Sequence, residues 1–142
     1  MSFPLLERWY KMKIWTKPGR IFTEKEGEEE VHCEIGVVDI RIERTKELCT
    51  LSLAYKDIMI LVDLPEIVIH EIRSKRYLRD RWTLRGIMFL NDKKGVYEMP
   101  MYRISLLIAR DNCDILELST KGICIHTEAK CVCDYIRKYT RA

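Results

Sequence analysis

The chain has 142 residues, of which 47% are hydrophobic and 33% charged, and its net charge is +3. This composition excludes a disordered chain, and the length predicts a single domain that buries about two-thirds of the surface of its unfolded chain. No apolar run approaches the ~20 residues that a membrane-spanning helix needs, and the N-terminus lacks the basic start and apolar run of a signal peptide. We therefore expect a cytoplasmic protein without a membrane partner.

Amide side chains are scarce in this sequence. It contains no Gln and only two Asn, Asn91 and Asn112, whereas Glu, Lys, Arg and Ile are abundant. Loss of thermolabile amides with enrichment of Glu and Lys is typical of proteins that work at high temperature. We expect a thermophilic bacterium or archaeon, or a virus of one, as the source. Because thermophile cytosols can hold disulfides, Cys33 or Cys49 could be either free or paired with another cysteine.

The N-terminal 19 residues predict a short helix followed by a turn. Leu5, Leu6, Trp9 and Met12 lie at helical spacing within residues 4–12. The sequence from 17 to 20, Lys-Pro-Gly-Arg, has the residue types of a turn.

From there the pattern changes to period two, which predicts strands. Apolar and polar residues alternate around Val38, Ile40 and Ile42, and shorter apolar runs follow at 51–54 and 58–62. Asp63 then stands at the cap position of a predicted helix over 64–77, with Pro65 and Glu66 in its first turn. A strand over 67–72 is the alternative, because that run is rich in β-branched residues.

The second half repeats this order. Strands are predicted at 87–90, 96–109, 115–118 and 123–125, with turns at 91–95, 110–112 and 121–122. Pro100 predicts an edge position or a bulge, since proline cannot donate to a strand ladder. Thr127 caps a predicted final helix in which Ala129, Val132, Cys133 and Ile136 form one face.

Aligning the two halves at offsets of 64 and 65 residues matches their apolar positions. Tyr102, Ile104 and Leu106 fall on Val38, Ile40 and Ile42, and the two predicted caps coincide. We therefore predict an α+β domain with a short N-terminal helix and turn at 1–19 and two tandem units, 20–82 and 83–142. Each unit has four antiparallel strands and a helix.

This strand–helix order resembles the Whirly family, the PUR-repeat proteins and related transcriptional coactivators over residues 20–140. The resemblance implies a curved antiparallel sheet that presents basic and aromatic side chains to single-stranded nucleic acid, often in a homo-oligomer. The Lys-Gly-Lys-Ala signature of plant Whirly proteins is absent from this sequence. No residue role is therefore carried over from the family.

Binding of single strands requires cations for the phosphates and aromatic faces for the bases. Residues of these two types lie at strand ends, at turns and in the basic segment 73–85, and they form the predicted interface: Tyr55, Lys56, Arg73, Arg76, Arg79, Arg81, Trp82, Lys93, Lys94, Tyr97, Arg103 and Lys121. Tyr102 and Phe89 are interpreted instead as packing residues. For the basic segment, contact with a duplex or an acidic partner, or a solvated helix face, are the alternatives.

Other chemistry has weaker support in the sequence. Cys131-x-Cys133 with Cys124 and His126 suggests a metal, but two helical cysteines at this spacing point about 200° apart, so we expect no metal site. The three histidines belong to no catalytic motif, and no glycine-rich phosphate loop is present. We expect neither an enzyme nor a cofactor.

The resulting hypothesis is a non-enzymatic protein that binds single-stranded DNA or RNA through a sheet face and its basic rim. The alternative is an assembly subunit or adaptor, which would use the same sheets for homo-oligomerisation or for a protein partner. A virus-encoded regulator of a host factor is a third hypothesis.

Overall fold

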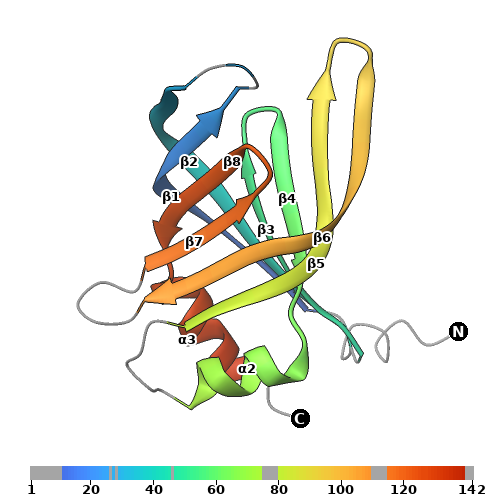
Figure 1. The fold of residues 1–142 in the computed structure, drawn as a ribbon. Helices are drawn as coiled ribbons and strands as arrows, with labels where there is room; N and C mark the ends of the chain where they lie inside the picture. The colour runs from blue at the N-terminus through green and yellow to red at the C-terminus, as the bar shows by residue number, and fades with distance from the viewer. Residues whose placement is uncertain are drawn as a thin grey trace, which may run out of the picture.

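The protein is an antiparallel barrel of eight strands with two short helices, as seen in the computed structural model (Figure 1). The structure describes residues 11–25, 27, 29–45, 47–74, 80–109 and 115–139. The elements in chain order are β1 (Lys11–Glu24), β2 (Val31–Arg44), β3 (Cys49–Tyr55), β4 (Ile58–Asp63), α2 (Glu66–Arg73), β5 (Asp80–Asp92), β6 (Gly95–Ala109), β7 (Ile115–Thr120), β8 (Ile123–Glu128) and α3 (Lys130–Tyr139).

Each strand pairs with its neighbour in sequence, and the pairing of β1 with β8 closes the barrel. This closing seam runs from Gly19 opposite Thr127 to Thr23 opposite Ile123. Closure removes most of the free sheet edge, which would otherwise be open to pairing with other chains.

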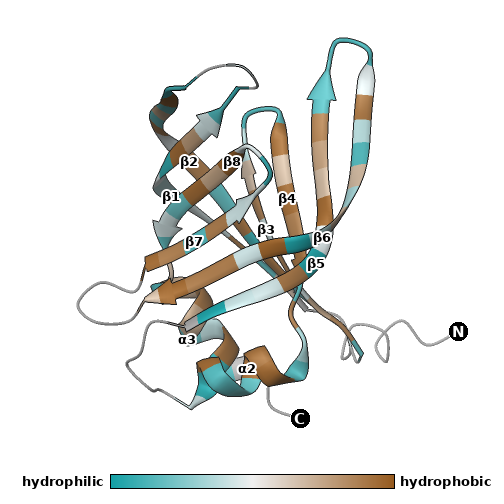
Figure 2. Ribbon diagram, viewed as in Figure 1, coloured by the Kyte–Doolittle hydropathy of each residue, from teal (hydrophilic) through white to brown (hydrophobic). Residues whose placement is uncertain are grey.

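Alternating apolar residues of the strands fill the barrel interior. Ile40, Leu53, Ile60, Leu106 and Ile125 are each fully buried, and Figure 2 shows the alternation of hydrophobic and hydrophilic positions along the strands. The helices pack together beneath one end of the barrel (Figure 1). Their buried faces complete the core and consist of Val68, Ile69 and Ile72 in α2 with Val132, Cys133 and Ile136 in α3.

Two hairpins, β1–β2 and β5–β6, are longer than the rest of the barrel. The pairing of β2 with β3 covers only Asp39–Arg44, and that of β6 with β7 covers only Ser105–Ala109. The outer part of each hairpin is therefore an edge of the sheet. Pro100 lies in this outer part of β6, as its missing N–H predicts.

The α+β class fits only loosely, because strands dominate the described residues. The predicted N-terminal helix lies mostly outside those residues, and its last two positions, Lys11 and Met12, begin β1. The turn predicted at 17–20 is wrong. Pro18 and Gly19 lie inside β1, opposite Val37 and Gly36, so pairing along a 14-residue strand outweighs the local turn preference.

Both helices form where they were predicted, but neither predicted cap does. Asp63 ends β4, and the residue before α2 is Pro65, which makes no capping side-chain bond. Thr127 lies within β8, and its hydroxyl donates to the Pro18 carbonyl oxygen at 3.0 Å. Both side chains belong to strands, so they cannot reach the first N–H groups of the helices.

Candidate functional site

The outward face of β5 carries cations. Arg81 and Arg85 are exposed, whereas the alternating Trp82 and Leu84 point toward the core. Arg81 Nη1 donates to Ser105 Oγ on β6 at 2.7 Å, which shows that both side chains lie on the same outer face.

A β-bulge in β6 adds two further side chains to this face. Leu84 pairs with Ile104 and Gly86 pairs with Met101, so Arg85 faces two residues, Tyr102 and Arg103. A bulge of this kind breaks the alternation and directs two consecutive side chains outward. Tyr102 is consequently 73% exposed. Its interpretation as a packing residue is wrong, as is its match to the fully buried Val38.

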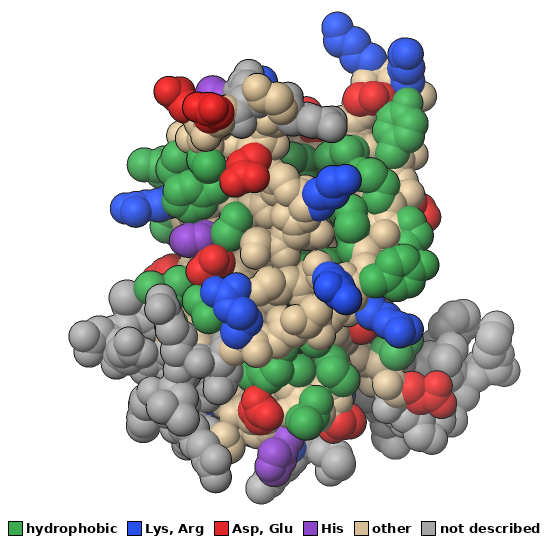
Figure 3. Space-filling view, in the orientation of Figure 1, with side chains coloured by type: hydrophobic (Ala, Val, Ile, Leu, Met, Phe, Trp, Pro, Cys, Tyr) green, Lys and Arg blue, Asp and Glu red, His purple; other side chains and the backbone are tan. Residues whose placement is uncertain are grey.

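Lys121 is exposed in the turn between β7 and β8. The pairing of β6 with β7 ends at Ser105 and Ser119, two residues before Lys121, and the Gly122 carbonyl oxygen of the same turn accepts the Glu24 N–H at 2.9 Å. We call Arg81, Arg85, Tyr102 and Arg103, together with Lys121 on the adjoining turn, the basic face. In the described part of the chain, none of its four cations has a carboxylate within salt-bridge distance. Figure 3 shows Lys and Arg side chains spread over this side of the barrel.

Tyr55 and Lys56 lie elsewhere and are already occupied. The Tyr55 hydroxyl donates to Glu34 Oε2 at 2.7 Å, and Lys56 Nζ donates to the same oxygen at 3.0 Å. These two bonds, and the charge of Lys56, lower the pKa of Glu34. Tyr55 is also buried, so it has no free ring face to offer a base.

Trp82 and Arg73 lie next to or on helix α2. The Trp82 Nε1–H donates to Glu71 Oε2 at 2.8 Å, and the ring packs against the core, which gives it a structural role. Arg73 is the last residue of α2. Arg76 and Arg79 lie outside the described residues.

Lys93, Lys94 and Tyr97 lie at the tip of the β5–β6 hairpin. Asp92 Oδ1 accepts the backbone N–H groups of Lys94 and Gly95 at 2.7 and 3.2 Å and shapes this turn. Tyr97 pairs with Leu90 and shares its face, which is the inner face of the hairpin. The predicted interface residues therefore do not form one surface. Arg81 and Arg103 share the outer face of β5 and β6, and the sequence prediction missed Arg85 and Tyr102 on that face.

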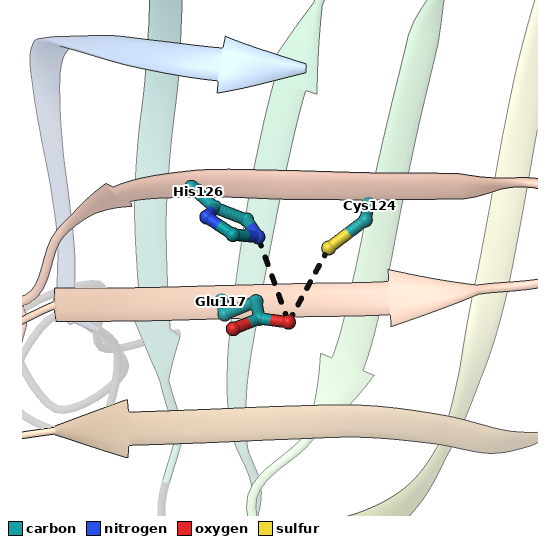
Figure 4. Close-up of side chains that lie close together, drawn as sticks. All are labelled: Glu117, Cys124 and His126. Carbon is teal, nitrogen blue, oxygen red and sulfur yellow. Dashed lines mark hydrogen bonds and ion pairs between the residues drawn. The ribbon is translucent and has the colours of Figure 1, made fainter. Parts of the chain in front are cut away.

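Three side chains with metal-ligating atoms meet on the outer face of β7 and β8. Glu117, Cys124 and His126 place their ligand atoms within 4.8 Å of one another (Figure 4). Glu117 Oε1 lies 3.5 Å from His126 Nε2 and 3.6 Å from Cys124 Sγ. Partial burial, and then the charge of Glu117, raise the pKa of the Cys124 thiol to about 12. The Phe22 ring packs on the His126 ring with centroids 4.8 Å apart.

The sequence analysis grouped Cys124 and His126 with the wrong partners. Cys131 and Cys133 are on α3, and Cys133 is fully buried. The missed signal was the strand alternation Cys-x-His, together with a glutamate on the neighbouring strand. All five cysteines in the described residues, including Cys33 and Cys49, are free thiols.

Comparisons of this chain with protein-family models, with curated proteins and with solved structures gave no match. The resemblance to single-strand-binding folds therefore stays a prediction. Among the described residues, no helix is long and apolar enough to cross a membrane.

Proposed function

We propose that this protein binds single-stranded DNA or RNA on the basic face, without catalysing a reaction. The observation that carries the proposal is the bulge in β6, which puts the exposed Tyr102 beside Arg85 and Arg103. An aromatic ring beside several cations, which form no ion pair among the described residues, is the combination that single strands require.

Each component of the face has a separate role in this proposal. The guanidinium and ammonium groups contact phosphates, and the Tyr102 ring stacks on a base, which contributes about 1–3 kcal/mol. A duplex keeps its bases stacked internally, so it gains only the phosphate contacts. We therefore expect a preference for single strands.

A salt titration tests the proposal. If all four cations contact phosphates, the logarithm of the affinity for a labelled single strand falls with the logarithm of salt concentration with a slope of about −2.8. Replacing Arg103 or Lys121 with alanine should weaken binding and reduce the steepness of that slope by about 0.7. Fluorescence anisotropy at several salt concentrations measures both quantities, with a duplex for comparison.

Lys130→Ala provides the matched control for charge. Lys130 is an exposed lysine at the start of α3, away from the basic face. Its replacement removes the same charge and should leave the affinity and the slope nearly unchanged. Equal losses for Lys130→Ala and Lys121→Ala would mean non-specific attraction by net charge and would contradict the proposal.

A second function, assembly with a protein partner or another copy of the chain, is favoured by the outer face of the β1–β2 hairpin. Val31, Ile35 and Val37 alternate along β2 on this face and are 50%, 78% and 60% exposed. Exposed apolar patches of this kind mark protein–protein contacts. Light scattering after gel filtration tests it: we expect a homo-oligomer that Ile35→Glu converts to a monomer. A monomeric wild-type protein would contradict self-association.

We also propose that the two halves are copies of one unit. The order of four strands and a helix occurs twice, and most matched core positions are alike. Ile40 and Ile104 are both fully buried, as are Leu53 and Leu118. A cytoplasmic location in a thermophile completes the proposal, on the composition alone.

A further inference from the structure

Neither proposed function uses the cluster of Glu117, Cys124 and His126. We propose that these three residues bind a divalent transition-metal ion, with zinc as the preferred metal. The inference is independent of the proposed function.

The strand register brings the three side chains together. Glu117 on β7 is the direct cross-strand partner of His126 on β8. Cys124 precedes His126 by two residues, so both side chains project from the same face of β8. The ligands thus come from two directly paired strands in the closed part of the barrel, where the backbone is held by hydrogen bonds on both sides.

Two of the separations between ligand atoms suit one tetrahedral ion, and all three ligand atoms lie within 4.8 Å of one another. Bonds of about 2.0–2.3 Å at tetrahedral angles put ligand atoms roughly 3.3–3.8 Å apart. Glu117 Oε1 meets this requirement toward both partners, at 3.5 Å to His126 Nε2 and 3.6 Å to Cys124 Sγ. The Phe22 ring packs against the imidazole of His126, with ring centroids 4.8 Å apart.

The donor set and the charge indicate the metal. Sulfur, imidazole nitrogen and carboxylate oxygen together are ligands of zinc, whereas magnesium and calcium prefer oxygen alone. A thiolate and a carboxylate carry two negative charges, which one divalent ion neutralises. The site is also partly sheltered, since the side chains of Glu117 and His126 are 21% and 34% exposed.

Three protein ligands leave a fourth position for water or a small ligand. His126 lines a groove of about 470 Å³, bounded also by Pro18, Arg20, Ile35, Ile115 and Glu128. Of the three proposed ligands, only His126 lines this groove. An open fourth position is the arrangement that distinguishes reactive zinc sites from purely structural ones.

Cobalt titration of the full chain under reducing conditions tests the site. After treatment with a chelator, one Co²⁺ per chain should produce a thiolate-to-cobalt charge-transfer band and the strong visible bands of tetrahedral cobalt. Zinc should abolish both by displacement. Cys124→Ser should remove the charge-transfer band, and Glu117→Gln and His126→Asn should each weaken binding roughly tenfold or more.

Cys131→Ser is the matched control, because Cys131 is also a partly buried thiol but lies on α3 outside the cluster. It should retain the full spectrum. Circular dichroism confirms that each variant is folded, and Glu117→Gln tests the site if loss of the cysteine disturbs the fold. Absence of a charge-transfer band in the wild type, or its persistence in Cys124→Ser, would overturn the proposal.

Discussion

The two long hairpins have similar backbones and different outer faces. Both β1–β2 and β5–β6 extend beyond their neighbours and bury apolar residues of their inner faces, such as Val38 and Ile40 in β2 and Leu84 and Met88 in β5. Farther out, the inner face of β2 carries the exposed His32 and Glu34. On the outer side, β1–β2 carries Val31, Ile35 and Val37, whereas β5–β6 carries Arg81, Arg85 and Arg103. The core restricts the buried inner residues of both hairpins to apolar side chains, whereas the outer residues are free to differ. The functional proposals rest on these outer residues.

A second difference is in the strand geometry. β6 contains a bulge opposite Arg85, whereas β1 and β2 pair without a shift in register. The regular hairpin keeps alternate side chains on alternate faces, and the bulged one places Tyr102 and Arg103 together on the outside. The bulge is therefore what makes a compact basic and aromatic surface on one hairpin only.

The largest expected effect is on stability. It comes from adding a side chain at Gly86 of β5 or Gly19 of β1, because each glycine lies close to a neighbouring strand. A Cβ on Gly86 would overlap the Leu61 carbonyl oxygen of β4, and backbone cannot move aside easily. A Cβ on Gly19 would lie 2.5 Å from Val38 Cγ2 and 2.8 Å from the His126 carbonyl oxygen. We expect Gly86→Ala to reduce the free energy of unfolding by about 3 kcal/mol and Gly19→Ala by about 1–2 kcal/mol, as measured by urea denaturation. A larger loss for Gly19→Ala than for Gly86→Ala would contradict this ranking. It would mean that β4 and β5 move apart to accept a side chain more easily than β1 and β8 do.

A smaller effect is expected on the affinity for nucleic acid when an exposed side chain of each hairpin is replaced with alanine. Tyr102→Ala removes the proposed stacking platform and should weaken binding of a single strand about tenfold, equivalent to about 1.4 kcal/mol. Ile35→Ala, at an equally exposed position of β2, should leave the affinity unchanged. Anisotropy titrations measure the affinity of both variants for a labelled single strand. Equal affinities would contradict binding at the basic face.

The hydrogen bond from Thr127 to Pro18 across the barrel seam is expected to contribute about 1 kcal/mol to the free energy of unfolding. Thr127→Val keeps the shape of a buried side chain but leaves the Pro18 carbonyl oxygen without its 3.0 Å donor, which should lower the free energy of unfolding by that amount. Thr83→Val on β5 is the control, since Thr83 is exposed and should change stability little. An unchanged unfolding curve for Thr127→Val would show that water satisfies the carbonyl.

The smallest expected effect is the pH dependence contributed by Glu34. Hydrogen bonds from Tyr55 and Lys56 lower the pKa of this carboxyl in the folded state below the ordinary value of a glutamate. The carboxylate therefore stabilises the fold at pH values above its unfolded pKa, and this contribution is lost as pH falls through the folded pKa. Wild type should exceed Glu34→Gln in melting temperature at pH 7, and the difference should disappear in acid. A difference that grows on acidification would contradict this linkage, and Glu98→Gln on β6 is the control.

Local sequence patterns identified most of the elements. The alternation around Val38, Ile40 and Ile42 predicted β2, and the apolar stripes of 68–72 and 132–136 predicted the two helices, because burial of one face imposes a period on the chain. The same patterns predicted β6 and the edge position of Pro100. They also supplied the cations Arg81, Arg103 and Lys121, although not their arrangement.

Tertiary structure decided the rest, since it depends on which distant segments pair. Pro18 and Gly19 have turn chemistry, yet the partners Val37 and Gly36 hold them in a strand, and the adjacent seam with β8 closes the barrel. The bulge that exposes Tyr102 comes from a register shift between β5 and β6, which no local window contains. Glu117 likewise meets Cys124 and His126 only through the pairing of β7 with β8. Periodicity reports which face of a strand is buried, whereas register, closure and convergence of side chains follow from long-range pairing that the whole chain determines together.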